Sequence, residues 1–228
     1  MNKANELIQA INSNPKMAED GRMANDLLRE FQRGYPVKNL RPLLNCQEPE
    51  IVKTAIFIAA ELGSKAASLL PLVSVLLDHP TNWVRSDAID CILTCATRAN
   101  EKEIATVITM LNDLNGAIRW KVLEFLTNAS QEQLLAGLSY FEKHGSDSKH
   151  IQGLRWLTNK DGNDLNSIES LLCSDNQLER KYGAIAAARS APSTIQPLLW
   201  AAKLVDEDVK DFADSMLKLR VSPNTSTP

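Results

Sequence analysis

Apolar residues recur along this chain with the period of an α-helix. In the segment 84–96, one helical face carries the apolar positions Val84, Ala88, Cys91, Ile92 and Cys95. The segment before it, 69–77, is almost entirely apolar, and a helix of that composition must be covered on most sides. Turn-forming and capping residues, with the sequence DHPTN, separate the two segments. The pattern therefore predicts two helices joined by a tight turn.

The same pair of helices recurs at a nearly constant spacing. An aliphatic residue followed by a base opens the second helix in four copies, at Val52-Lys53, Val84-Arg85, Ile118-Arg119 and Val209-Lys210. The first three openings are 32 and 34 residues apart, from 52 to 84 and from 84 to 118. A period of this length is the signature of a helical repeat protein.

Two further copies are less regular. Leu178 fits the apolar template, but Glu179 stands where the base is expected. In the fourth copy, Ile151 lies at the expected distance, yet Arg155 occupies a position that should be apolar. The register of the fourth copy therefore stays open.

These copies resemble the HEAT repeat, in which a Pro-Leu-Leu helix, an Asp/Pro turn and a Val-Arg helix follow one another. Pro42 and Pro197 each open a Pro-Leu-Leu segment, and the resemblance extends over 37–219. It implies an all-α fold, a right-handed α-solenoid of about six degenerate HEAT-like helix pairs with an N-terminal helical cap. We expect one continuous domain, with the cap at 1–36, the repeats at 37–220 and a disordered tail at 221–228. HEAT repeats serve unrelated functions, so the resemblance does not define an activity.

The charge of the chain argues against a global attraction to nucleic acid or to anionic membranes. It carries 25 basic and 28 acidic residues, for a net charge of −3 at pH 7. No run of about 18 apolar residues predicts a membrane span, and residues 1–16 lack the apolar core of a signal peptide. We therefore expect a cytoplasmic protein without membrane contact.

No pattern of catalytic or metal-ligating residues stands out. Cys91 and Cys95 lie one helical turn apart, but no histidine or second cysteine pair completes a metal site, so we interpret them as small core residues. The histidines, His79, His144 and His150, fall at turns or helix starts and are expected at the surface. We predict that the protein is not an enzyme and that it holds no metal and no cofactor.

The resemblance implies that the second helices line the concave face of the solenoid. Side chains at the +2, +3 and +6 positions after each opening point away from the predicted core. These positions and one tryptophan of the fourth copy are the candidate partner-binding residues: Asp87, Asp90, Trp120, Lys121, Glu124, Trp156, Arg180 and Lys181. Tryptophan and arginine are enriched among interface hot spots.

Other conspicuous side chains receive a structural interpretation. Trp83 and Trp200 are interpreted as packing residues. The bases that open the second helices are expected to pair with acids of the preceding turns, such as Glu50, Asp78 or Asp113.

We interpret the chain as a non-enzymatic protein-binding scaffold, either an adaptor or a toxin-neutralising immunity protein, that holds another protein on its concave face. The alternative is a nucleic-acid-binding protein that resembles the HEAT-like alkylpurine DNA glycosylases. Its basic and aromatic groove would use Trp120, Arg155, Trp156, Arg180 and Lys181, with Asp87 or Asp90 as the acid. The pI of about 5.7 argues against this alternative, because phosphate contacts dominate such affinity. A third interpretation, a relationship to HEAT-repeat phycobilin lyases, has no specific residue in its support. The sequence leaves the oligomeric state open.

Overall fold

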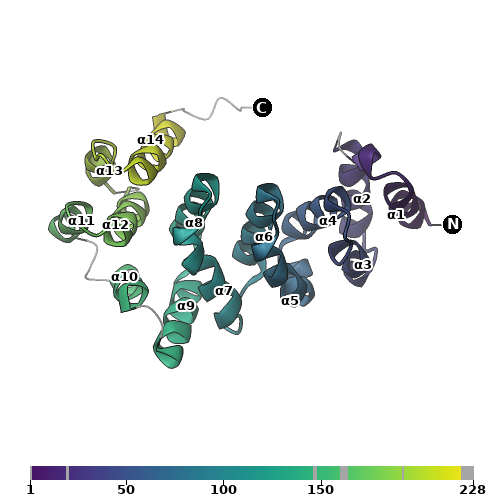
Figure 1. The fold of residues 1–228 in the computed structure, drawn as a ribbon, viewed down its shortest axis with the longest axis horizontal. Coiled ribbons are helices and arrows are strands. Elements are labelled where there is room, and N and C mark those ends of the chain that lie inside the picture. The colour runs from purple at the N-terminus through teal and green to yellow at the C-terminus, as the bar shows by residue number, and fades with distance from the viewer. Residues whose placement is uncertain (1, 19–20, 146–147, 160–163, 192, 222–228) are drawn as a thin grey trace. The chain divides into compact units, whose positions relative to one another are not determined.

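The structure, a computed structural model, describes residues 2–18, 21–145, 148–159, 164–191 and 193–221. Within these ranges every regular element is a helix and there is no strand (Figure 1). The prediction of an all-α helical-repeat fold is therefore confirmed. No helix in the same ranges is long and apolar enough to cross a membrane. Of the predicted tail at 221–228, Val221 is the last residue of helix α14 (Glu207–Val221), and the rest lies outside the described residues.

The chain divides into two compact units, Met1–Val107 (unit 1) and Ile108–Pro228 (unit 2), with the boundary inside α7 (Glu101–Thr109). Unit 1 contains a first helix pair and two further pairs, in which the first member is short and partly 3-10 helical. Before α7, its elements are α1 (Lys3–Ser13), η1 (Pro15–Ala18), α2 (Arg22–Gln32), η2 (Val37–Leu40), α3 (Arg41–Leu44), α4 (Pro49–Glu61), η3 (Gly63–Leu69), α5 (Leu70–Val73), η4 (Ser74–Asp78) and α6 (Asn82–Cys95).

Proline and glycine set the ends of these helices. Pro42 and Pro71 lie in the first turn of α3 and α5, where a missing N–H is tolerated. Gly63 follows α4 with a φ of +55°, a left-handed conformation that favours glycine. The Pro-Leu segments of the sequence thus mark helix starts.

The core of unit 1 lies where α4 packs against α6. The predicted apolar face of α6 is buried at all five positions: Val84, Ala88, Cys91, Ile92 and Cys95. The predicted register of this helix is therefore confirmed. On its own side, α4 buries Val52, Ala55, Ile56 and Ala59. The alanines in both helices allow the two backbones to approach closely.

Unit 2 contains the remaining helix pairs. Its elements are η5 (Met110–Asn112), α8 (Gly116–Asn128), α9 (Gln131–His144), α10 (Ser148–Thr158), α11 (Leu165–Leu172), α12 (Gln177–Ser190), α13 (Gln196–Ala201) and α14 (Glu207–Val221). Helix α12 is central, because it contacts α8, α10, α11, α13 and α14 (Figure 1). Ala184, Ala186, Ala187 and Ala188 are all buried, and these small side chains let helices approach α12 from several sides.

The structure defines the register of the fourth copy. Helix α10 buries His150, Gly153, Leu154 and Leu157, which share one helical face. Arg155 is exposed and binds Glu142 of α9, with Nη2 2.8 Å from Oε1. Ile151 therefore does not open the buried face as the sequence pattern suggested. The expectation of a surface position is also wrong for His150, because this side chain is buried and its Nδ1 lies 2.9 Å from the Tyr182 hydroxyl.

The crossing of α10 and α12 gives a first prediction. A Cβ added to Gly153 would clash with the Tyr182 ring, so Gly153→Ala must displace a buried aromatic side chain. We expect a loss of about 1–3 kcal/mol in the free energy of unfolding, measured by urea denaturation. Gly116→Ala is the matched control, because its Cβ would meet only the end of Arg119 at 3.4 Å. Equal stability of the two variants would contradict the close approach.

Candidate functional site

Arginines close the turns that precede three second helices. Arg85, Arg119 and Arg180 are each the fourth residue of their helix, α6, α8 and α12. Each Nη1 donates to the backbone carbonyl six residues earlier, at 3.0 Å to His79, 2.8 Å to Asp113 and 2.9 Å to Ser174. The predicted pairing of base and turn acid is confirmed for Lys53 and Glu50, at 3.4 Å. At the three arginines, the base also binds the turn backbone itself.

This contact corrects the register of the fifth copy. Asn115 and Asn176 cap α8 and α12 in the same way, each accepting from two N–H groups of the first turn. Arg180 therefore matches Arg119, and the apolar position of the template falls on Glu179 rather than on Leu178. The sequence alignment was wrong by one residue, because Leu178 is apolar and buried at a neighbouring position.

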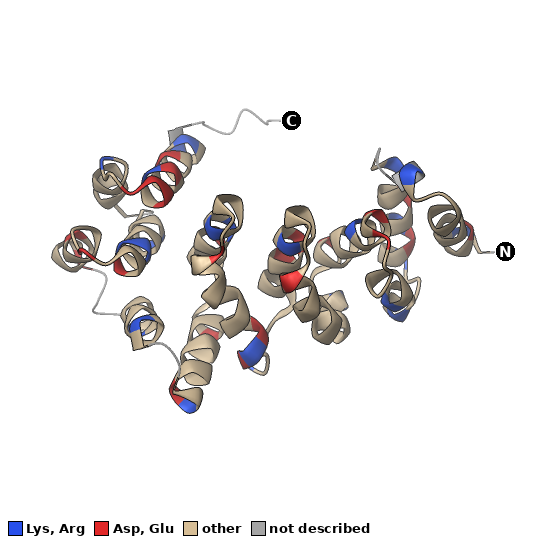
Figure 2. Ribbon diagram, in the orientation of Figure 1, with Lys and Arg blue, Asp and Glu red and all other residues tan. Residues whose placement is uncertain are grey.

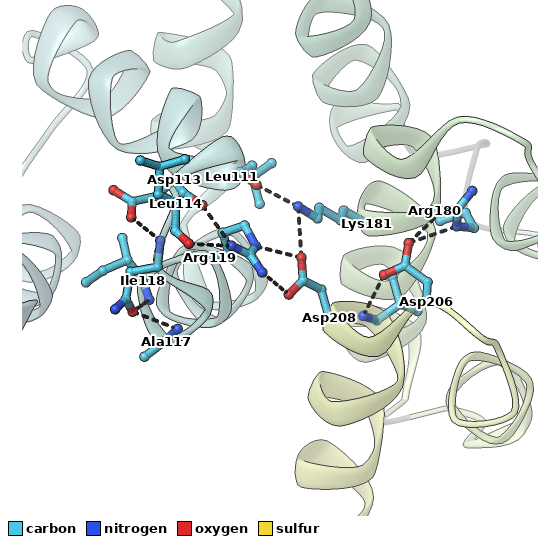
Figure 3. A network of polar contacts seen from close by, with 12 residues as sticks. Leu111, Asp113, Leu114, Ala117, Ile118, Arg119, Arg180, Lys181, Asp206 and Asp208 are labelled. Carbon is cyan, nitrogen blue, oxygen red and sulfur yellow. Dashed lines mark hydrogen bonds and ion pairs between the residues drawn. The ribbon is translucent and has the colours of Figure 1, made fainter.

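Helices α8, α12 and α14 of unit 2 each carry both basic and acidic residues (Figure 2), and an ionic network joins the three helices (Figure 3). Arg119 forms a bidentate pair with Asp208, through Nε at 2.7 Å and Nη2 at 2.8 Å. The Nζ of Lys181 lies 3.1 Å from the same carboxylate and donates to the Leu111 carbonyl at 2.7 Å. Beside it, Arg180 donates to Asp206 through Nε and Nη2, at 2.9 and 2.7 Å. Two consecutive bases of α12 thus hold the start of α14.

The network keeps charges that are largely removed from water. Lys181 is only 1% exposed, and an ammonium group at that depth requires partners. Burial opposes ionisation of Asp208, but hydrogen bonds from Arg119 and Lys181 outweigh it and lower the pKa of this carboxyl. The hydrogen bond to Asp208 in turn raises the pKa of Arg119. Asp208 and Arg119 are therefore both charged at neutral pH.

A cavity of about 610 Å³ adjoins this network between the turns that precede α12 and α14. Arg119, Arg180, Asp206 and Asp208 contribute to its wall. The other lining residues are Leu172, Cys173, Ser174, Gln177, Leu204, Val205 and Glu207. The wall thus combines salt-bridged side chains with an aliphatic rim, and its Ser174 hydroxyl donates to the Glu179 carboxylate at 2.5 Å.

Three of the eight predicted partner-binding residues contribute to the interior packing and ionic network of unit 2. Lys181 was expected on an exposed face and is buried, because Asp208 and the Leu111 carbonyl satisfy it in the interior. Arg180 is part of the same network. Trp120 is half-buried, with its ring 6.2 Å from the buried Phe212 ring in an edge-on contact. Trp120 therefore contributes to packing between α8 and α14.

The five remaining predicted residues are all half-buried. Lys121 and Glu124 form an ion pair of 2.8 Å along α8, and Trp156 is half-buried in α10. Asp87 and Asp90 belong to α6 of unit 1, where Asp87 lines a pocket of about 300 Å³ with Phe57 and the Glu50–Lys53 pair. Their role in partner binding stays a prediction.

The nucleic-acid alternative loses much of its basic groove. Arg155, Arg180 and Lys181 are salt-bridged to Glu142, Asp206 and Asp208, respectively. Charges that are already neutralised by carboxylates offer little to phosphate groups.

Sequence reasoning missed several exposed apolar side chains. Trp83 was interpreted as a packing residue, but it is 70% exposed at the second position of α6. Val75, in η4 before the same turn, is 69% exposed. In unit 2, Leu114 and Val205 are exposed at 102% and 97%. All four flank or lie in turns before second helices. For Leu114 and Val205, an apolar residue directly before a capping residue was the available signal.

Comparisons with known proteins concern the fold only. No protein-family model matches the chain, and no curated protein matches it. Among solved structures, a designed armadillo repeat protein in complex with the peptide (KR)4 is 16% identical, with 95% of this chain and 99% of that chain covered and a TM-score of 0.46. A computationally designed armadillo repeat protein for modular peptide recognition has the same identity and coverage, with a TM-score of 0.48. An engineered protein is 18% identical over 81% of this chain and 96% of its own, with a TM-score of 0.41.

Proposed function

We propose that this chain is a non-enzymatic scaffold that binds another protein through the turns that precede its second helices. Each unit has its own turn edge: in unit 1 it is the turn before α6, and in unit 2 it comprises the turns before α8 and α14. The observation that carries the proposal is the exposure of large apolar side chains there: Val75, Trp83, Leu114 and Val205. We further propose that the helix pairs are HEAT-like and that the protein is cytoplasmic.

These side chains have little to contribute to folding. Leu114 and Val205 directly precede the capping residues Asn115 and Asp206. An apolar residue at that position often packs against the fourth helical residue, but here the fourth residues are Arg119 and Lys210. Burying such a side chain stabilises by about 1.5–3 kcal/mol, a contribution that a partner can supply.

The turn edge of unit 2 is also held in place before any partner arrives. Arg119 fixes the turn before α8 through the carbonyls of Asp113 and Leu114, at 2.8 and 3.2 Å, and binds Asp208 of α14. A pre-organised surface loses less conformational entropy on binding. Both an adaptor and a toxin-neutralising immunity protein require such a surface, and we propose these two roles for the scaffold.

Trp83→Ala tests the proposal. The native partner is first captured from host extract with the wild-type chain and identified by mass spectrometry, and its affinity is then measured by calorimetry. We expect Trp83→Ala to weaken binding by about 2 kcal/mol, roughly 30-fold, because exposed tryptophans are frequent hot spots. Its free energy of unfolding should stay near wild type, since the ring is mostly in water.

Two controls make the result specific. Leu219→Ala removes an equally exposed side chain from the far end of α14 and should bind normally. Lys121→Glu probes the α8 surface favoured by the sequence pattern. Loss of binding in Lys121→Glu together with normal binding in Trp83→Ala would place the interface on α8. A wild-type chain that retains no protein would contradict the scaffold function itself.

A further inference from the structure

Two buried thiols lie next to each other near the C-terminal end of α6. The Sγ atoms of Cys91 and Cys95 are 3.8 Å apart, and the Cys95 thiol donates to the Gly63 carbonyl at 2.9 Å. The proposed scaffold function does not use either group. We infer that this pair is a binding site for a soft, thiophilic species that bonds to both sulfur atoms, with trivalent arsenic compounds as the matching chemical class.

The sulfur separation favours a bridging atom over a disulfide. Residues one turn apart on a helix have Cβ atoms about 5–6 Å apart. A disulfide requires about 3.5–4.5 Å between the Cβ atoms and about 2.05 Å between the sulfurs, so the last turn of α6 would have to unwind. Trivalent arsenic is pyramidal, and with bonds of about 2.3 Å to sulfur and an angle of about 100° it holds two thiolates about 3.5 Å apart. The intact helix holds the two sulfurs within about 0.3 Å of this spacing.

The number of sulfur atoms in the site determines which class of thiophilic species it can bind. Across the described residues, no group of three or more His, Cys, Asp or Glu side chains is placed to hold a metal ion, so the site offers two sulfur atoms. A structural zinc site needs four protein ligands. A monosubstituted trivalent arsenical needs only two, because its own carbon fills the third position. The pair therefore completes the coordination of arsenic but not that of zinc.

Entry to the site depends on the end of the helix. Cys95 is the last residue of α6, and Ala96 continues in an extended conformation. Terminal turns open more readily than helix interiors, so opening of this turn exposes both thiols without unfolding unit 1. Bridging the sulfurs then replaces the hydrogen bond from Cys95 to Gly63.

The bond changes balance without an oxidant. Phenylarsine oxide reacts with two thiols: two arsenic–sulfur bonds form, the arsenic–oxygen bond breaks, and both thiol protons leave with that oxygen as water. Arsenic stays trivalent and both sulfurs keep their oxidation state. The reaction therefore needs nothing besides the folded chain and the arsenical.

The test uses the full chain with Cys46→Ser and Cys173→Ser, which removes the two thiols outside the pair. We expect phenylarsine oxide to give one adduct per folded chain by intact-mass measurement, with the loss of two titratable thiols. The adduct should persist in millimolar glutathione and be released by a dithiol. Cys91→Ala and Cys95→Ala, checked for folding by circular dichroism, should retain the adduct at least 100-fold less well in glutathione.

Other outcomes would overturn the inference. If only the urea-unfolded chain reacts, the two thiols are inaccessible core residues in the folded chain. If the folded chain loses one thiol per arsenic, the sulfurs do not bridge. Formation of a disulfide by diamide with an unchanged helical spectrum would show that the 3.8 Å spacing does not resist oxidation. None of these readouts depends on a protein partner, so their failure would leave the scaffold function untouched.

Discussion

Asp208→Ala is expected to lower the free energy of unfolding by about 3–5 kcal/mol. The substitution removes the carboxylate that binds Arg119 and Lys181 and leaves the ammonium group of Lys181 buried with only the Leu111 carbonyl. Breaking one side of a buried ion pair is costly because the remaining charge keeps its desolvation penalty. Urea denaturation followed by circular dichroism measures the loss.

Lys181→Met distinguishes two contributions to the free energy of unfolding: the loss caused by an unpaired buried charge and the net stabilisation by the ion pair. In this variant Asp208 keeps its bidentate contact with Arg119, and an apolar chain of similar length fills the interior. Buried ion pairs replaced by apolar groups are often near neutral, so we expect a change of at most about 1 kcal/mol. Adding Lys181→Met to Asp208→Ala should restore part of the lost stability. Equal losses in both single variants would contradict this account.

The same carboxylate makes the effect depend on pH. The pKa of Asp208 in the folded state lies below its ordinary value of 3.8, so its ionised form stabilises the fold. This contribution is fully present above the ordinary value and is lost as the pH falls through the folded-state pKa. The stability difference between wild type and Asp208→Asn should therefore be full at pH 7 and shrink below about pH 4. A difference that stays constant down to pH 2 would contradict the assigned ionisation.

Ala88→Asp is expected to destabilise unit 1 by more than about 4 kcal/mol. Ala88 is fully buried on the face of α6 that packs in the unit 1 core. A carboxylate there loses its hydration without a partner, and its extra atoms overfill a closely packed interface. We expect a chain that is largely unfolded in unit 1 at 37 °C, detected by loss of amide protection in α4 and α6.

Ser86→Asp provides the matched control. It introduces the same charge into the same helix, two residues earlier, at a half-exposed position. Its stability should stay within about 0.5 kcal/mol of wild type, as surface substitutions usually do. If Ala88→Asp and Ser86→Asp have the same melting temperature, the buried face of α6 has been misassigned.

The sequence predicted the helix pairs well because their cause is local. Apolar spacing, capping residues and prolines act over one or two turns, so the class of fold and the buried face of α6 could be derived from the residues alone. Register was lost where an apolar residue stood next to the true position, as at Leu178. In the fourth copy, Gly153 is buried but gives no apolar signal in the sequence. The space beside it is filled by the Tyr182 ring of α12.

The candidate site was harder to predict because exposure depends on neighbours that are distant in sequence. Trp120 follows an apolar opening and a base, and only the approach of Phe212 turns it into a packing residue. Lys181 carries a charge, and the ion pair with Asp208 compensates for the desolvation of its buried ammonium group. Trp83 was predicted to pack, yet its side chain is 70% exposed at the start of α6.

The ion pairs of unit 2 also bear on how the chain folds. Arg119 and Asp208 are 89 residues apart in sequence, and Lys181 and Leu111 are 70 apart. Contacts of such high contact order form late, because the entropy of closing a long loop is lost before the contact is gained. During synthesis, α8 and α12 emerge before the carboxylate that neutralises their bases. Unit 2 is therefore expected to become protease-resistant only after residue 208 has been added, whereas the close sequence neighbours α4 and α6 can pair much earlier.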